Sequence, residues 1–207
     1  GATYVTLHDL MRIAALSGMR INEICNLRVE DAAGEIFNVR DSKTKAGIRR
    51  VPIHSDLKAL VERRSKGKAA SDYLIEELKA PESRSKERSA KASERFTAYR
   101  REVGVDEREE GPRVSTVNFH SWRHWFTKAL QAGQPPHLVS AVVGHEAGRS
   151  TMTLKVYDSG ASEAQLRAVV ESVRLPEGVP ISSPVGPKMG DGVRVACVCP
   201  GLIETPM

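Results

Sequence analysis

Cysteine and long apolar runs are both scarce in this chain of 207 residues, and each scarcity narrows the class of protein. The three cysteines, Cys25, Cys197 and Cys199, are odd in number and form no Cys-x-x-Cys pair, which argues against a disulfide framework and a zinc knuckle. No apolar stretch is long enough to span a bilayer, and the first residues do not resemble a signal peptide. We therefore expect a cytoplasmic protein without a membrane partner.

Acidic clusters are also missing, while positive charge is in modest excess. The chain has 31 Lys and Arg against 26 Asp and Glu, a net charge of +5, which favours a polyanionic partner. The acids Glu23, Asp31, Glu35 and Asp41 are scattered around a predicted hairpin and lack the arrangement of a two-metal nuclease. We expect neither a metal nor a cofactor.

The apolar pattern predicts a mainly helical chain with one small antiparallel hairpin, which is an α+β fold. Leu7, Leu10, Met11 and Ala14 follow the spacing of a helix that Gly18 can close. A second helix begins at once, with Arg20 at its start and Glu23 one turn further on.

From Glu35 to His54 the pattern changes to two short strands around a turn at Ala46-Gly47. The apolar residues assigned to these strands are Ile36, Val39, Ile48, Val51 and Ile53. Residues 55–110 are expected to be helical and highly charged, with a solvated or mobile run at 82–95. Three further helices are predicted, at 120–131, 136–143 and 162–173.

Helical periodicity divides the segment "HSWRHWFTKAL" into two faces. The polar face holds His120, Arg123, His124 and Thr127, and the apolar face holds Trp122, Phe126, Ala129 and Leu130. We expect the apolar face to be core and the polar face to carry chemistry. For this helix taken alone, a solvated cationic face is the alternative.

Six side chains separated in the sequence resemble, in order and rough spacing, the catalytic set of the tyrosine recombinase (phage integrase) family. They are Arg20 in "LSGMRINEICNL", Lys43 in "SKT", His120 and Arg123 in His-x-x-Arg, His145 after a glycine, and Tyr157 in "RSTMTLKVY". The resemblance implies a catalytic domain over residues 1–175, followed by a linker and tail at 176–207. The amino-terminal DNA-clamping domain of that family is not found, and the spacing from His145 to Tyr157 is longer than in many relatives.

The resemblance implies a reaction at a DNA phosphodiester. Tyr157 would attack the phosphorus and form a 3′-phosphotyrosyl intermediate. Lys43 would be the general acid, with Lys45 as the alternative. Arg20 and Arg123 would bind the phosphate oxygens, because a guanidinium stays charged and can bind two oxygens at once.

The remaining site residues would support this chemistry. His120 could help to deprotonate the tyrosine, His145 would donate a hydrogen bond to the phosphate, and Glu23 would hold the guanidinium of Arg20. Lys45, Arg49, Arg50 and His124 are the expected DNA contacts, with Arg49 and Arg50 on backbone phosphates or in solvent. The implied partner is double-stranded DNA at the nucleoid, on which a homo-oligomer, a tetramer, would assemble.

Structural alternatives stay open for each residue. Arg20 could simply pair with Glu23, His145 could cap a helix, and Tyr157 could pack beneath the last helix. A DNA-binding relative without cleavage activity is the second functional hypothesis. A third arises because "GVRVACVCPGLIETPM" at 192–207 is similar to a segment of short-chain dehydrogenases, but no Gly-rich loop or Tyr-x-x-x-Lys accompanies it.

Overall fold

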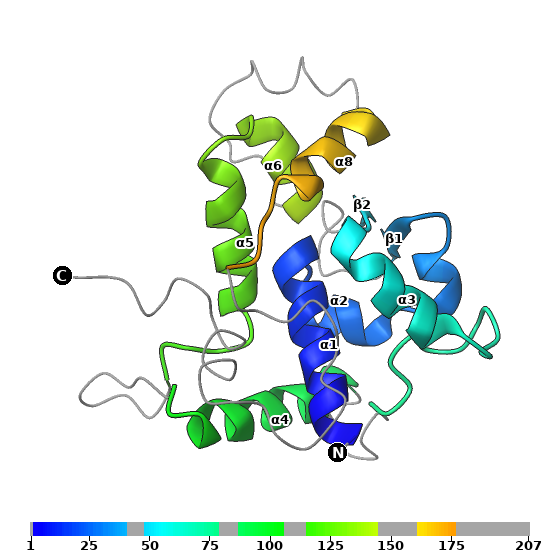
Figure 1. The fold of residues 1–207 in the computed structure, drawn as a ribbon, viewed down its shortest axis with the longest axis vertical. Coiled ribbons are helices and arrows are strands. Elements are labelled where there is room, and N and C mark those ends of the chain that lie inside the picture. The colour runs from blue at the N-terminus through cyan, green and yellow to red at the C-terminus, as the bar shows by residue number, and fades with distance from the viewer. Residues whose placement is uncertain (1, 41–47, 79–86, 106–114, 145–160, 177–207) are drawn as a thin grey trace.

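Helices make up most of the described part of the chain (Figure 1). The computed structural model describes residues 2–40, 48–78, 87–105, 115–144 and 161–176. In chain order the elements are α1 (Ala2–Ser17), α2 (Ile21–Asn26), η1 (Val29–Ala32), β1 (Ile36–Val39), β2 (Arg49–Pro52), η3 (Ser55–Leu57), α3 (Lys58–Ser65), α4 (Ser89–Glu102), α5 (Ser121–Gln131), α6 (Pro136–Val143) and α8 (Glu163–Glu171). The two strands pair antiparallel. The mainly helical α+β class predicted from the sequence is confirmed.

Helix α1 lies at the centre of the core. The predicted stripe of Leu7, Leu10, Met11 and Ala14 is buried. Burial does not stop at this stripe, because every residue from Thr6 to Met19 is buried between α2, α4, α5 and η3. Figure 1 shows the helix running through the middle of the molecule. A helix covered on all sides must satisfy its polar side chains inside the protein.

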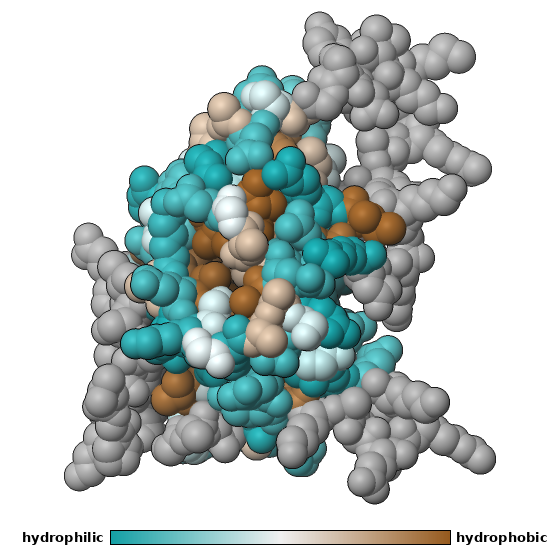
Figure 2. Space-filling view, turned by 90° about the vertical axis from the view of Figure 1, so that its right-hand side faces the viewer, coloured by the Kyte–Doolittle hydropathy of each residue, from teal (hydrophilic) through white to brown (hydrophobic). Residues whose placement is uncertain are grey.

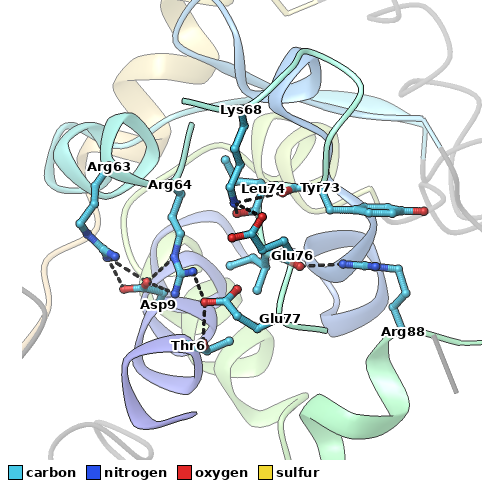
Figure 3. A network of polar contacts seen from close by, with 11 residues as sticks. Thr6, Asp9, Arg63, Arg64, Lys68, Tyr73, Leu74, Glu76, Glu77 and Arg88 are labelled. Atoms are coloured by element: carbon cyan, nitrogen blue, oxygen red, sulfur yellow. Dashed lines mark hydrogen bonds and ion pairs between the residues drawn. The ribbon is translucent and has the colours of Figure 1, made fainter. Parts of the chain in front are cut away.

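The polar side of α1 finds its partners on α3 and on the segment that follows it (Figure 3). Arg63 Nη2 donates to both carboxylate oxygens of Asp9 at 2.8 Å. Arg64 donates through Nε to Asp9 at 2.7 Å and through Nη1 to Glu77 at 2.6 Å. We call these four residues the Asp9 cluster. Its two guanidiniums and two carboxylates cancel in charge.

Helix α8 packs against α6 and β2. Ser162 caps its first turn by accepting a hydrogen bond from the Gln165 backbone N–H. At its other end the Ser55 backbone N–H and hydroxyl donate to Glu171 at 2.8 and 2.7 Å. These contacts fix the last described helix to the residues that follow the hairpin.

The charged run predicted to be solvated is in part a packed helix. Helix α4 begins at Ser89, and Ala92 is fully buried. Arg88 is buried too, and its guanidinium donates to the carbonyls of Cys25 and Ile75 at 2.9 and 2.6 Å. The prediction of a solvated segment was therefore wrong for Arg88, Ser89 and Ala92, whereas Ala90, Lys91, Ser93 and Glu94 are exposed. Residues 82–86 lie outside the described part of the chain.

Hydrophilic side chains cover most of the face that carries α3 and the sheet, with apolar groups visible between them (Figure 2). None of the described helices has both the length and the apolar character that crossing a bilayer requires.

Candidate active site

Arg20 occupies the N-cap of α2, directly after the turn that ends α1. Gly18 makes this turn possible with φ of 63°, and its N–H donates to the Ala14 carbonyl at 2.9 Å. Glu23 then holds Arg20 twice: its Oε2 accepts from the Arg20 backbone N–H at 2.8 Å, and its Oε1 accepts from Nη1 at 2.9 Å. The Arg20 side chain remains 38% exposed, whereas that of Glu23 is 4% exposed. The guanidinium of Arg20 is thus held by the buried Glu23 and remains partly exposed to solvent.

Arg123, a buried residue in the first turn of α5, contacts the same turn between α1 and α2. Its Nη1 donates to the Gly18 carbonyl at 2.7 Å and its Nη2 to the Val143 carbonyl at 2.6 Å. Among the described residues its Nε has no hydrogen-bond partner. Burial and, after it, the charges of Arg20 and Arg49 lower the pKa of Arg123 to about 10, against an opposing effect of Glu23. The side chain remains charged at neutral pH.

Arg49 also binds Glu23, a contact that the sequence analysis did not predict. Its Nη1 and Nη2 donate to the two oxygens of Glu23 at 3.1 and 3.0 Å, and its Nε donates to the Val142 carbonyl at 2.7 Å. The side chain is 5% exposed. The Arg49 side chain therefore points into the protein and not into solvent, which was one of its two expected surroundings.

The alternation of strand β2 contains the signal that would have placed Arg49. Residues 49, 51 and 53 face one side of a strand, and Val51 and Ile53 are core residues. Ile48 belongs to the other side and is 59% exposed. The sequence analysis grouped Ile48 with Val51 and Ile53 by hydrophobicity alone, and it therefore missed that Arg49 shares their side of the strand.

Arg20, Glu23, Arg49 and Arg123 form what we call the Glu23 cluster. Counted over these four residues, three positive charges face one negative charge, an excess of two positive charges. Burial would raise the pKa of Glu23, but the hydrogen bond and charge of Arg49, and the contacts with Arg20, outweigh it and hold this pKa below its usual value. An anion of one or two negative charges would balance the cluster.

The histidines of α5 lie outside this buried group. His120 is the N-cap residue and His124 lies one turn later; both are exposed, and their rings meet edge to face at 4.8 Å. The predicted faces of α5 hold only in part. Arg123 is buried although it was assigned to the polar face, and Ala129 is exposed although it was assigned to the core.

Four predicted site residues, Lys43, Lys45, His145 and Tyr157, lie outside the described part of the chain. The described residues that adjoin them in the sequence lie next to the contacts of Arg49 and Arg123. Val39 pairs with Arg49 at the end of the strands from which the hairpin continues. Gly144, which ends α6 with φ of 71°, follows directly on the two carbonyls that bind Arg49 and Arg123.

Other charged groups near the sheet are paired. Arg50 is exposed and lies 3.2 Å from Glu163, and Arg40 pairs with Glu30 and Asp31. A cavity of about 320 Å³ has Glu23 in its lining, but none of the three arginines of the Glu23 cluster. Its lining holds equal numbers of arginines and carboxylates, so the cavity does not share the excess of positive charge.

Residues 2–159 match the model of the Phage integrase family, and this span covers most of the chain. The chain belongs to the phage integrase family. No curated protein and no solved structure matches the chain. The matched span of this integrase contains the Glu23 cluster together with Lys43, His120, His145 and Tyr157. Family membership indicates a site-specific recombinase domain of the tyrosine type that acts on DNA.

Proposed function

We propose that this integrase cuts and rejoins DNA strands at a specific site through a covalent bond to Tyr157. The observation that carries the proposal is the excess positive charge of the Glu23 cluster, in a chain of this family. A phosphodiester supplies one negative charge, and attack on its phosphorus concentrates charge on the nonbridging oxygens. Arg20, which is partly exposed, and Arg123 are the groups that would bind these oxygens.

In the cleavage step the Tyr157 oxygen bonds to phosphorus and the bond to the 5′ oxygen breaks. The phenolic proton leaves with the help of His120 and of the surrounding positive charge, since the phenol has a pKa of about 10 in water. The departing 5′ oxygen takes a proton from Lys43, or from Lys45 as the alternative. His145 donates a hydrogen bond to the phosphate. The 3′-phosphotyrosyl bond keeps the energy of the broken bond, so a second 5′ hydroxyl can rejoin the strand without ATP.

Double-stranded DNA is the partner in this proposal, bound in the cytoplasm at the nucleoid by a tetramer of this chain. Lys45, Arg50 and His124 would add contacts to the DNA. Arg50 and His124 are both exposed, as such contacts require. The catalytic domain would extend to about residue 175, because Val173 is still part of the core, and residues 176–207 would form a tail.

A covalent trap tests the reaction and identifies the target sequence in one experiment. The protein is incubated with a pool of nicked duplexes of randomised sequence, treated with SDS, and the bound DNA is sequenced. Wild type should form an SDS-resistant adduct on a defined sequence, and Tyr157→Phe should form none. DNA binding without any adduct would instead identify a binding protein that lacks cleavage activity.

A further inference from the structure

Arg49 differs from the other arginines of the Glu23 cluster: it lacks the exposure of Arg20, and its Nε has a hydrogen-bond partner, whereas the buried Nε of Arg123 has none among the described residues. Three of its N–H directions end on Glu23 and on the Val142 carbonyl. A side chain that is 5% exposed and bound in this way is not in a position to reach a DNA backbone.

The contact with Glu23 fixes the group that holds Arg20. Arg49 binds both carboxylate oxygens in the parallel, two-bond geometry that a guanidinium allows. The same two oxygens accept from the Arg20 backbone N–H and from its Nη1. The carboxylate that binds Arg20 is therefore itself held at both oxygens by Arg49.

The contact with Val142 fixes the end of α6. The last carbonyls of a helix have no partner within it and carry the negative end of its dipole. Arg49 donates to Val142 and Arg123 donates to Val143, so two guanidiniums hold two successive carbonyls. The chain continues from there through Gly144 to His145.

Arg49 therefore joins three elements, α2, β2 and the end of α6. It lies on β2, which continues the hairpin of Lys43; it binds Glu23 of α2, beside Arg20; and it binds the end of α6, which leads to His145. We propose that Arg49 is a positioning residue, which fixes Arg20 relative to the end of α6 and makes no contact with DNA. The inference rests on the proposed recombinase function.

The experiment compares Arg49→Met and Arg49→Lys with wild type on a defined nicked duplex recovered from the random pool. Single-turnover cleavage at saturating DNA should fall about 100-fold in Arg49→Met, because misplacement of a reacting group by about 1 Å has an effect of that size. Arg49→Lys should fall about tenfold or more, since an ammonium cannot bind the carboxylate and the carbonyl in the same geometry. If Arg49→Met does not fold, Arg49→Lys carries the test.

The affinity for the duplex and its salt dependence separate positioning from DNA contact. Both should match wild type in the Arg49 variants. Loss of a phosphate contact would instead weaken binding and reduce the slope of log affinity against log salt by about 1. That result, or a cleavage rate equal to wild type, overturns the proposal. Arg63→Met is the matched control, because Arg63 also donates to both oxygens of a buried carboxylate, away from the site. It should keep the wild-type cleavage rate in its folded fraction.

A readout that needs no DNA keeps this inference separate from the proposed function. The Glu23 carboxyl is titrated by carbon NMR, together with amide exchange in the last turn of α6. Arg49→Met should raise the Glu23 pKa and speed exchange in that turn, and Arg63→Met should do neither. If wild type forms no adduct, the recombinase proposal fails; unchanged titration and exchange in Arg49→Met would then remove the positioning role as well.

Discussion

The Asp9 cluster and the Glu23 cluster are built from the same materials and differ in charge balance. Each buries a carboxylate under two guanidiniums, Asp9 under Arg63 and Arg64, Glu23 under Arg20 and Arg49. The Asp9 cluster has Glu77 as a second carboxylate and no net charge (Figure 3). The Glu23 cluster has a third guanidinium instead. A balanced group needs nothing more, whereas a group with excess charge is completed by a ligand of opposite sign.

Breaking the balanced cluster should give the largest loss of stability. In Arg64→Met the fully buried Asp9 loses the guanidinium of Arg64, and breaking a buried pair from one side costs about 3–5 kcal/mol. The free energy of unfolding in urea measures this loss. The double variant Asp9→Leu with Arg64→Met should recover part of it, because the buried carboxylate that lost Arg64 is then removed as well. A loss below about 1 kcal/mol would contradict the structural role of the cluster.

Substitution of Arg20, the partly exposed arginine of the Glu23 cluster, should strongly reduce activity with little change in stability. Removal of one preorganised donor costs about 100-fold to 1000-fold in rate, or about 3–4 kcal/mol, and we expect Arg20→Ala to slow adduct formation by this amount. The melting temperature should change little, because Arg20 is 38% exposed and Arg49 remains to neutralise Glu23. Equal cleavage by Arg20→Ala and wild type would exclude Arg20 from the reaction.

The buried His8, which lies beside Asp9 on α1, should make the free energy of unfolding depend on pH. It is buried on α1, and burial, followed by the charge of Arg12, lowers its pKa to about 4. Between about pH 6.5 and 4 the unfolded chain binds this proton and the folded protein does not. Stability is therefore complete above pH 6.5 and falls as the pH drops to 4, by up to about 3 kcal/mol. In His8→Leu, denaturant unfolding should show a flatter profile in this window; parallel profiles would contradict the prediction.

Anion binding should give the smallest effect and is specific to the Glu23 cluster. At a concentration about fivefold above its dissociation constant, sulfate should stabilise wild type by about 1 kcal/mol. Thermal unfolding at matched ionic strength in chloride and sulfate measures the difference. Arg63→Met should respond as wild type does, whereas Arg20→Ala should keep only the general salting effect of sulfate. An equal response of all three proteins would remove the anion site.

Local chemistry explains which elements could be predicted. Helix α6 begins and ends where the sequence indicates, because Pro136 suits the first turn and Gly144 adopts the left-handed conformation at the end. The stripe on α1 was right, but its burial on all sides depends on where α2, α4 and α5 pack. No periodicity in α1 itself contains that information.

The site was predictable to the extent that its residues carry a recognisable order. Arg20 and Glu23 are one turn apart in the sequence, and their contact follows from helix geometry. The contacts of Arg123 with Gly18 and Val143 span 105 and 20 residues and depend on tertiary packing. The inward direction of Arg49 was missed because Ile48 was grouped with Val51 and Ile53, against the alternation that Val51 and Ile53 set.

The close packing of Gly18 against Phe126 implies that substitution of this glycine should abolish function. A Cβ atom there would lie 2.4 Å from Cδ1 of Phe126, the backbone already has positive φ, and its carbonyl accepts from Arg123. Replacing this hydrogen with a methyl group would therefore push α5 away from α1 and move the guanidinium with it. A random screen for lost strand exchange should recover Gly18 as readily as the arginines, although it has no functional group of its own.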